Sequence, residues 1–400
     1  MTRIWPTNRQ GKRSLYERYL LKVGDIGMLR NIPGCEALPE KWDYSAPNGV
    51  CLSIVRNLED LSEHSDAWDQ LFLKSNCHPT VSYAWIKGFF KHLLDPSETW
   101  ICMFAYRGKD LIGVLPLIVR KAYRIAGLSV ILFRTPYNEM HTSSVECLMP
   151  PDNDEAFDIF YECLFHIPRS LPIIRFREIY GDSPVLIRCA LTSFAKNENY
   201  IPLTEDYETY RSSISSNLRR LLKRSLKKLN KIDNVSFVMR EKQRSTEDNF
   251  NRFMDAEDAS WKGEESSSIK ALPHHADALL EIASELNKRG WVEWNFIETE
   301  DKTIAAHFAI RVNRKLYIDK IGYDEHYKDC SPGNLLFNQA IEDAFSNGDV
   351  EELNTGADCP WHYQWQVKSR KTYDAVIIPQ IPVLCCILKA AFKILKKFHA

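Results

Sequence analysis

The strongest constraint on the fold is an order of predicted elements that occurs twice along the chain. Each half shows a helical pattern, a hairpin, a third strand, a second helix and a further strand. The hairpins contain GKDLIGVLPLIVRK (108–121) and DKTIAAHFAIRVNRK (301–315), which occupy equivalent places. A repeated order of this kind indicates an internal duplication. It predicts an α/β fold of two tandem domains, each with a central mixed sheet flanked by helices.

The length supports the same division, because 400 residues exceed the usual size of one domain. Residues 1–50 are predicted to be an N-terminal extension, since prolines and glycines interrupt any periodic pattern there. The first domain is predicted over 51–205 and the second over 206–380. Residues 381–400 are predicted to form a basic amphipathic C-terminal helix, which either contacts a membrane surface or docks on the second domain.

Composition narrows the class of protein. The formal net charge is −1, so the surface as a whole favours neither anionic nor cationic partners. Eleven cysteines without a C-x-x-C pair argue against a disulfide framework and a structural zinc site. We find no secretory signal and no apolar stretch long enough to span a membrane, which predicts a cytoplasmic protein. The histidines lack metal-ligand spacing, so no metal is expected.

Residues 320–336 carry the strongest functional signal. They predict a strand, a loop that ends in Gly333, and the start of an amphipathic helix. A helix N-terminus offers unpaired N–H groups and the positive end of the helix dipole, which suit a pyrophosphate. Glycine allows close approach of the backbone. An ordinary strand-to-helix turn is the alternative. The matching place in the first half, 151–155, is acidic and should repel a pyrophosphate.

The loop from Lys328 to Gly333 resembles the acyl-CoA pyrophosphate loop of GNAT acyltransferases, with Ser331 in place of the first glycine. The wider pattern is similar to the CelD/BcsL-type acetyltransferases of that superfamily, which are linked by name to cellulose biosynthesis and related to FemAB-like peptidyltransferases. Four motifs carry this resemblance in the order of that branch, over residues 50–375. They are Tyr210-Arg211-Ser212 with the basic helix after it, 257–263, Tyr323-Asp324-Glu325 and Ser331-Pro332-Gly333.

This resemblance implies an N-acyltransferase with acetyl-CoA or another acyl-CoA as co-substrate. The implied acceptor is an amino sugar, a saccharide carrier or a related metabolite, in polysaccharide or cell-envelope biosynthesis. The cofactor contacts it implies are Lys328, Cys330, Ser331, Gly333 and Asn334. The acceptor contacts it implies are Trp261, Lys262, Tyr323 and Arg211.

Three residues are candidates for proton transfer. Glu257 and Asp324 are candidate general bases. Tyr363 resembles the tyrosine that protonates the leaving thiolate in many GNAT enzymes, although the branch's lysine beside it is missing. The alternatives are a salt bridge for Glu257, a turn for Asp324 and core packing for Tyr363.

Two other functions remain open. The basic helix over 211–231 contains eight Lys and Arg residues, Arg211 included. It could grip the phosphates of a charged tRNA, as in a FemAB-like aminoacyl transferase, or bind a phospholipid or another anionic acceptor, or simply be solvated. We expect no nucleic-acid partner. A non-catalytic component of polysaccharide export is the other alternative. The sequence determines neither the acyl group nor the oligomeric state.

Overall fold

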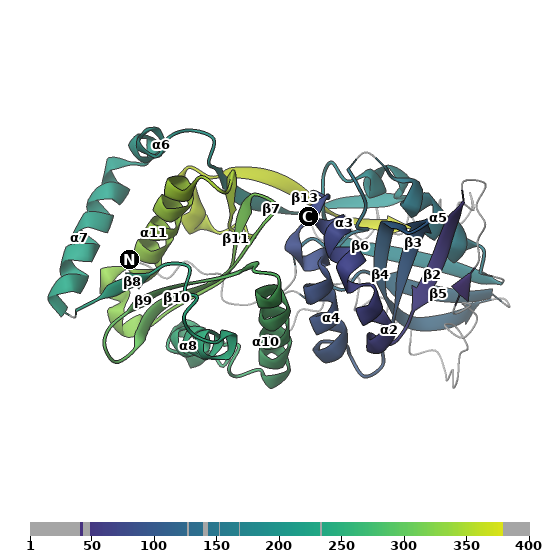
Figure 1. Cartoon of the computed structure of the whole chain (residues 1–400), viewed down its shortest axis with the longest axis horizontal. Coiled ribbons are helices and arrows are strands. Elements are labelled where there is room, and N and C mark those ends of the chain that lie inside the picture. The colour runs from purple at the N-terminus through teal and green to yellow at the C-terminus, as the bar shows by residue number, and fades with distance from the viewer. Residues whose placement is uncertain are drawn as a thin grey trace.

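The computed structural model of the chain describes residues 41–42, 49–125, 128–138, 143–151, 153–167, 169–232 and 234–378. Thirteen strands in this part of the chain form one continuous twisted sheet (Figure 1). Their order is β1-β2-β3-β4-β5-β6-β13-β7-β12-β11-β10-β9-β8. The C-terminal helix predicted over 381–400 and most of the predicted extension lie outside the described residues. No helix within those ranges is long and apolar enough to cross a membrane.

The first half forms one side of this sheet and its covering helices. Its elements are β1 (Lys41–Trp42), β2 (Val50–Val55), α2 (Leu58–Glu63), α3 (Ser65–Leu73), η1 (Pro79–Val81), α4 (Tyr83–His92), β3 (Thr99–Arg107), β4 (Asp110–Ile125), β5 (Leu128–Arg134), α5 (Glu155–Phe165), β6 (Ser170–Tyr180) and η2 (Pro184–Arg188). Strands β2 to β5 pair antiparallel in chain order, and β6 returns parallel to β5 after α5. Helices α2 and α3 are separated only by His64, whose ring lies 2.6 Å from the Tyr106 hydroxyl.

The second half repeats this connectivity. Its elements are α6 (Tyr207–Ser213), α7 (Ser216–Ile232), β8 (Ser236–Val238), α8 (Thr246–Asp258), α9 (Trp261–Glu264), α10 (Pro273–Lys288), β9 (Val292–Glu298), β10 (Thr303–Val312), β11 (Lys315–Tyr323), η3 (Glu325–Cys330), α11 (Pro332–Asn347), β12 (Glu352–Asn354) and η4 (Pro360–Trp365). Strands β9, β10 and β11 are antiparallel, and β12 runs parallel to β11 after α11. The repeated crossover confirms the predicted α/β fold with tandem units. The predicted basic helix is interrupted at Ile214, where the backbone is extended.

Two strands tie the halves together. Strand β13 (Lys368–Ile377), from the C-terminal end of the described chain, pairs with β6 of the first half. Strand β7 (Leu191–Pro202) pairs with β12 of the second half, and β7 and β13 also pair with each other. Figure 1 shows both strands running across the middle of the molecule. Strand β7, which follows the first half in the sequence, therefore extends the sheet of the second half, and β13, which follows the second half, extends the sheet of the first. The predicted division at residue 205 does not describe this exchange.

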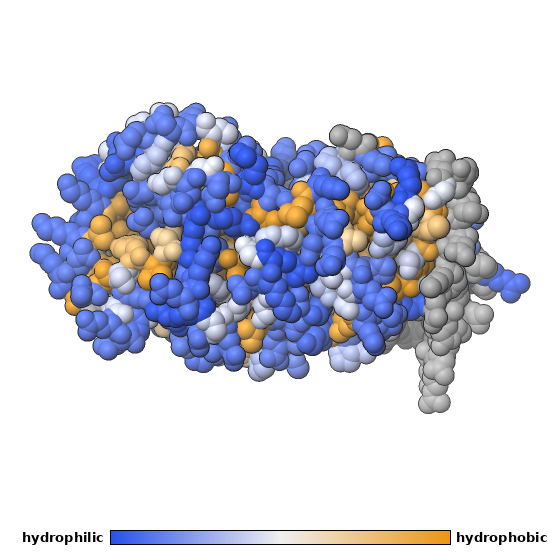
Figure 2. All heavy atoms as spheres, in the orientation of Figure 1, coloured by the Kyte–Doolittle hydropathy of each residue, from blue (hydrophilic) through white to orange (hydrophobic). Residues whose placement is uncertain are grey.

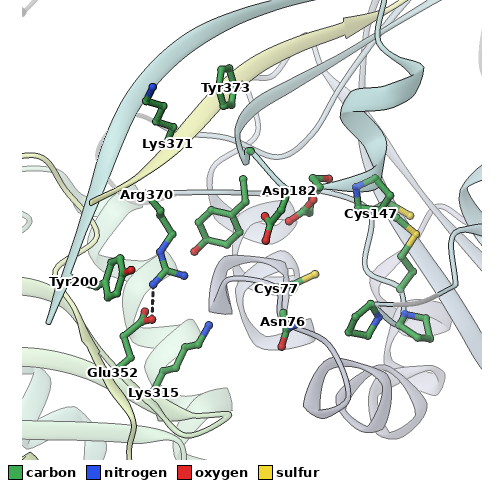
Figure 3. A pocket seen from close by; sticks show the side chains of 18 residues that line it. Asn76, Cys77, Cys147, Asp182, Tyr200, Lys315, Glu352, Arg370, Lys371 and Tyr373 are labelled. Atoms are coloured by element: carbon green, nitrogen blue, oxygen red, sulfur yellow. Dashed lines mark ion pairs between the residues drawn. The ribbon is translucent and has the colours of Figure 1, made fainter. Parts of the chain in front are cut away.

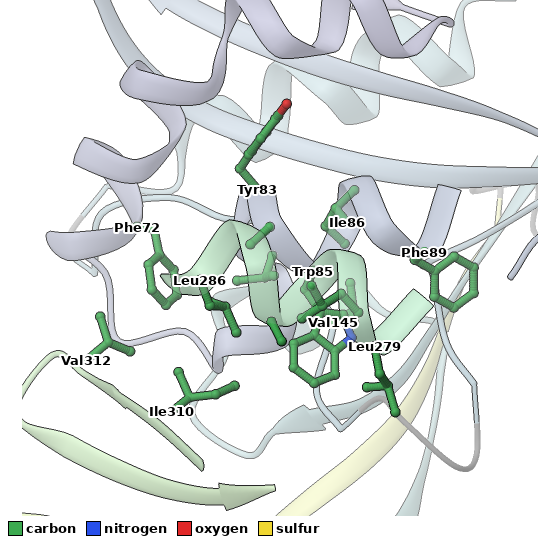
Figure 4. Close-up of a cluster of buried hydrophobic side chains, with 14 of the residues drawn as sticks. Phe72, Tyr83, Trp85, Ile86, Phe89, Val145, Leu279, Leu286, Ile310 and Val312 are labelled. Carbon is green, nitrogen blue, oxygen red and sulfur yellow. The ribbon is translucent and has the colours of Figure 1, made fainter. Parts of the chain in front are cut away.

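The halves also share a hydrophobic core where α4 packs against α10 (Figure 4). Trp85 and Phe89 on α4 and Leu279 and Leu286 on α10 are all buried there. A Cβ atom added at Gly88 would lie 2.6 Å from Ile282 Cγ1, so glycine allows the two helices to approach closely. The two units are therefore packed together rather than joined by a linker alone.

Candidate acyltransferase site

A cavity opens where strands β11 and β12 stop pairing. Their register covers only residues 315–317 on β11 and 352–354 on β12. Beyond Tyr317, β11 continues to Tyr323 without a strand on that edge. Residues 318–323 line a cavity of about 630 Å³, a size typical of small-molecule sites. An unpaired strand edge offers peptide N–H and C=O groups to an extended ligand.

A β-bulge shapes the strand that lines this cavity. Ala309 pairs with Ile318, but Phe308 pairs with Lys320, so Asp319 is the extra residue. Asp319 and Lys320 both line the cavity, and their charged groups lie 3.1 Å apart. The sequence analysis did not single out either residue, because a bulge depends on the register with the neighbouring strand.

The N-terminus of α11 closes one end of the cavity, as expected for the loop after β11. Lys328, Ser331, Gly333 and Asn334 line the cavity there. The first turn of α11 contains no acidic side chain. The N–H groups of Gly333 and Asn334 belong to this turn, where no preceding helical carbonyl pairs with them. The arrangement suits an anion.

The backbone of this loop differs in one detail from the sequence analysis. Ser331, with φ of 48°, has the left-handed conformation, whereas Gly333 lies within the helix. A Cβ at Gly333 would be 3.4 Å from a ring carbon of Tyr323, an ordinary contact. Glycine is therefore not required here by backbone strain, and its lack of a side chain leaves open space on the cavity side.

The equivalent helix of the first half is arranged differently. Glu155 and Asp158 lie in the first turn of α5. Arg107 pairs with Glu155, and Arg188 pairs with Asp158 at 2.6 Å. These carboxylates already satisfy the helix dipole and would repel an added anion. The contrast with α11 favours the second half as the anion site.

Cys330 is separated from the other cofactor candidates. Its side chain is fully buried among Tyr327, Leu335 and Leu336, and it does not line the cavity. Burial raises the pKa of its thiol, which keeps the group neutral. Four of the five cofactor candidates are thus brought together, and Cys330 packs beneath them.

Three of the four predicted acceptor contacts line the cavity, and one does not. Trp261, Lys262 and Tyr323 line the cavity. Arg211 is an exposed residue at the end of α6, where its guanidinium lies 3.6 Å from the Glu208 carboxylate. It does not line the cavity.

Glu257 lies just behind the cavity wall on α8 and is only 1% exposed. One carboxylate oxygen accepts a 2.5 Å hydrogen bond from Lys262 Nζ, and the other accepts a 2.9 Å bond from the Ile269 N–H. A Cβ at Gly322 would lie 2.7 Å from the Glu257 Cα, so this glycine lets α8 lie directly against β11. The arrangement fixes Lys262 at the cavity.

The other two proton-transfer candidates are also held by neighbours. Asp324 caps η3 by accepting a bond from the His326 N–H at 2.9 Å, and its second oxygen accepts a 2.6 Å bond from Lys302. Tyr363 is 50% exposed and donates to Asp358 at 2.5 Å, a hydrogen bond that raises the tyrosine pKa. Neither residue is part of the cavity lining.

His362 is a cavity residue that the sequence analysis missed. It is buried, and its Nδ1 lies 3.1 Å from both the Ala357 carbonyl and the Thr355 hydroxyl oxygen. Thr355 donates its own proton to the Asn199 carbonyl at 2.9 Å, so both neighbours accept from Nδ1–H. Nε2 then carries the lone pair. Burial lowers the His362 pKa to about 4, so the ring is neutral near pH 7.

His307 on β10 is a second missed histidine in the lining. Burial lowers its pKa to about 3, and its Nδ1 is buried without a hydrogen-bond partner among the described residues. A single histidine within an apolar strand gives no periodic signal. For His362 a signal existed, because it precedes Tyr363 in the stretch already examined.

Comparison with known proteins agrees with this geometry. Residues 216–364 match the family model described as an acetyltransferase (GNAT) domain. That range contains α9, β11, α11 and His362, and thus nearly all of the cavity lining. No curated protein matches the sequence at a significant level.

Three solved structures illustrate the likeness in fold. FemX is 10% identical, with a TM-score of 0.54 over 81% of this chain and 97% of FemX. The C-terminal domain (DUF2156) of a putative lysylphosphatidylglycerol synthetase from Agrobacterium fabrum is 11% identical, with a TM-score of 0.50 over 83% of this chain and 96% of that one. A tandem GNAT protein from the clavulanic acid pathway is 9% identical, with a TM-score of 0.43 over 82% and 98%. At such identities the likeness concerns the fold alone.

The family match and the site lie in the same part of the chain. The matched range covers the unpaired edge of β11 and the N-terminus of α11, where an anion and an extended ligand can be held together. Residues 216–364 are similar to the GNAT acetyltransferase domain, and this match supports an acyltransferase.

Proposed function

We propose that the protein is an acyl-CoA-dependent N-acyltransferase whose donor lies along the unpaired edge of β11. The observation that carries this proposal is the continuity of the cavity from residues 318–323 to the acid-free N-terminus of α11. The β11 edge can pair with the amides of pantetheine. The first-turn N–H groups and Lys328 can hold the pyrophosphate.

The acceptor is an amine that attacks the thioester carbonyl from the side of Trp261 and Lys262. A C–N bond forms, the C–S bond breaks, and the amine loses one proton while the leaving thiolate gains one. His362 is suited to accept the amine proton, because its Nε2 lone pair is free while Nδ1–H is held by Ala357 and Thr355. The reaction needs no covalent enzyme intermediate, and alignment of the two substrates supplies much of the rate.

The earlier candidates receive positioning roles in this proposal. Glu257 holds Lys262 at the cavity, and Asp324 fixes the start of the loop that leads to α11. Tyr363 lies one residue from His362 and orders η4 through Asp358.

The proposed acceptor is an amino sugar, a saccharide carrier or a related metabolite, in polysaccharide or cell-envelope biosynthesis. Its support is the resemblance to CelD/BcsL-type enzymes. The aromatic face of Trp261 and the charged pair Asp319 and Lys320 in the cavity also suit a hydroxylated amine.

The proposal is tested by thermal unfolding with acetyl-CoA, with ATP as the control ligand. Binding to the native state raises the melting temperature by mass action, so acetyl-CoA at millimolar concentration should raise it by several degrees. Asn334→Asp should abolish this shift, because it places a carboxylate in the first turn of α11 without changing the size of the side chain.

Asn347→Asp, the same substitution at the exposed far end of α11, is the matched control and should keep the full shift. A flat response of the unaltered protein to acetyl-CoA would refute the proposed donor. An equal response in both variants would show that the donor binds elsewhere.

A second candidate donor is an aminoacyl-tRNA, and α7 is the observation that favours it. Helix α7 contains no acidic residue and packs against η3 and α11. Lys223, Arg224, Lys227 and Lys231 are exposed and make no ion pair or hydrogen bond with any described residue. Figure 2 shows mostly hydrophilic residues at the end of the molecule where Figure 1 places α7. Such a row of cations suits a phosphate backbone.

A further inference from the structure

A second cavity, which we call the junction cavity, lies where the two halves meet (Figure 3). Its volume is about 720 Å³, within the range of small-molecule sites. Strands β6, β7 and β13 and the loops before η1 and α5 contribute to its walls, together with Lys315 on β11 and Glu352 on β12. It shares no lining residue with the proposed donor cavity.

The junction cavity and the α11 end of the donor cavity lie on opposite faces of the sheet. Successive side chains of a strand point to opposite faces. Lys315 lines the junction cavity, whereas Leu316 packs in the hydrophobic cluster that includes Phe337 of α11. On β12, Glu352 lines the junction cavity and Leu353 joins that same cluster. A ligand in the junction cavity is therefore separated by the sheet from a donor at α11.

One wall of the junction cavity carries positive charge. The Lys315 ammonium points into the cavity in Figure 3 and makes no hydrogen bond or ion pair with any described residue. Arg370 pairs with Glu352 and lies 4.2 Å above the Tyr200 ring, and its Nε is buried without a hydrogen-bond partner among the described residues.

The positive charges of this wall also act on His78, a buried histidine next to it. Burial is the main cause that lowers the His78 pKa, and the charges of Lys196, Lys315 and Arg370 lower it further. The wall is therefore electropositive, because Lys315 has no partner among the described residues and Arg370 lies beside it. It suits an anionic group of a ligand.

The facing wall carries carboxyl groups. Glu146 is almost fully buried, and burial raises its pKa to about 7 against an opposing hydrogen bond with Ser183. The charge of nearby Asp182 contributes in the same direction. The Asp182 carboxylate points into the cavity in Figure 3. A carboxyl group near its pKa can both accept and donate hydrogen bonds, as hydroxyl groups require.

We propose that the junction cavity is a second ligand site that binds a sugar phosphate, with the phosphate against Lys315 and Arg370 and the sugar hydroxyls against Glu146 and Asp182. The cavity is far larger than an inorganic phosphate needs, which favours an organic anion. This inference does not depend on the identity of the acyl donor.

The experiment is isothermal titration calorimetry of the full chain with glucose 1-phosphate, N-acetylglucosamine 1-phosphate and fructose 6-phosphate. Saturating CoA is present throughout, so that a phosphate site at α11 does not contribute. We expect at least one of the three to bind about tenfold or more tightly than glucose or inorganic phosphate, since both walls contribute only with the combined ligand. Absence of heat with all three at millimolar concentration would overturn the proposal.

Two lysine variants distinguish a specific phosphate contact of Lys315 from general electrostatic attraction of anions to the cavity. Lys315→Met should weaken the best ligand by about tenfold or more. Lys371→Met is the matched control, because Lys371 lies at the same cavity but its ammonium points away from the centre in Figure 3, and it should leave the affinity unchanged. An equal loss in both variants would show only bulk electrostatics.

A third variant tests the opposite wall and does not depend on the folding of the lysine variants. Asp182 is exposed, so Asp182→Asn should leave the fold intact. It should weaken the sugar phosphate several-fold and leave the weak binding of inorganic phosphate unchanged. If it weakens neither ligand, the hydroxyl contacts assigned to this wall are wrong.

Discussion

At the residue scale, the site is defined by which polar atoms remain available. Both carboxylate oxygens of Glu257 and of Asp324 accept hydrogen bonds from protein groups. These carboxylates are therefore engaged by the protein itself, and neither side chain lines the cavity. The neutral His362, with one ring nitrogen fixed and the other free, is better suited to receive a proton.

Replacing His362 with alanine should lower acetyl transfer to a test amine such as glucosamine by about 100-fold or more, the usual contribution of a general base. The acetyl-CoA melting shift should be preserved, because His362 does not lie at the α11 N-terminus. Release of CoA thiol measures the rate. Because only the neutral amine can attack, the rate should fall as the acceptor amine becomes protonated, and charging of His362 near pH 4 should remove the rest.

Asp324→Asn is the comparison for this assignment. It keeps the hydrogen bond to the His326 N–H and loses only the ion pair with Lys302. We expect its turnover to stay within a few-fold of the unaltered protein. A large loss in this variant together with a normal rate in His362→Ala would identify Asp324 as the base.

At the scale of single elements, α7 is the helix whose role is most open. No residue of α7 lines the donor cavity. Leu229 packs against Tyr327 and Cys330 of the loop before α11, but the basic face contacts this loop only through the exposed ion pair of Lys228 and Asp329 at 3.4 Å. Exposed ion pairs of this kind contribute little to stability. For an acyl-CoA donor, the basic face of α7 is therefore dispensable.

The double variant Lys223→Glu and Lys227→Glu should change acetyl transfer less than twofold and leave the acetyl-CoA melting shift intact, because both side chains are exposed and unpaired. Matching glutamine substitutions separate loss of charge from reversal of charge. Fluorescence anisotropy with total tRNA measures the competing function. Tight tRNA binding that both double variants abolish, with no response to acetyl-CoA, would favour the aminoacyl-tRNA donor.

At the scale of the whole molecule, Glu285 on α10 is a centre of contact between the halves. It accepts hydrogen bonds from Lys87 of α4 at 2.7 Å, from Lys288 at 2.9 Å and from Arg289 at 2.8 Å. Arg289 also pairs with Asp69 of the first half. Burial alone would raise the Glu285 pKa, but these hydrogen bonds outweigh it and lower the pKa to about 2.

Glu285→Gln should lower the free energy of unfolding at pH 7 by about 1–3 kcal/mol, since it leaves three cations without their carboxylate. A carboxyl group with a lowered folded pKa stabilises above its unfolded pKa. The difference from the unaltered protein should therefore be complete above about pH 4.5 and vanish as pH falls towards 2. Urea unfolding across this range measures it.

The pH profile of the unaltered protein must be compared with that of Glu285→Gln, because Asp69 changes the free energy of unfolding with pH in the opposite direction to Glu285. Burial raises the Asp69 pKa to about 6 despite the charge of Arg289. Its charged form is disfavoured in the folded state, so its own contribution to stability falls as pH rises from about 4 to about 6 and is constant above that. Subtracting the two pH profiles removes the part of this background that does not depend on the Glu285 charge, which is the smallest of the causes acting on Asp69. A difference that stays constant down to pH 2 would contradict the role assigned to Glu285.

The sequence by itself determined the features that depend on local pattern. β-rich runs on either side of short turns predict the hairpins at 108–121 and 301–315, and their repetition predicts two similar α/β units. The strand, loop and helix over 320–336 were also readable, because a glycine-ended loop and an amphipathic stripe are consecutive in the chain. These local signals located the loop, and the resemblance to the GNAT pyrophosphate loop named four of the cavity residues in it, Lys328, Ser331, Gly333 and Asn334.

The tertiary structure alone decided the features that depend on pairing between distant segments. The exchange of β7 and β13, the bulge at Asp319 and the end of pairing after Tyr317 are properties of strand register. The burial of Glu257 against Lys262 and the fixed ring of His362 depend on neighbours brought in from other elements. Hydrogen-bond partners and desolvation set which side chain is free to react, and both are properties of the packed molecule.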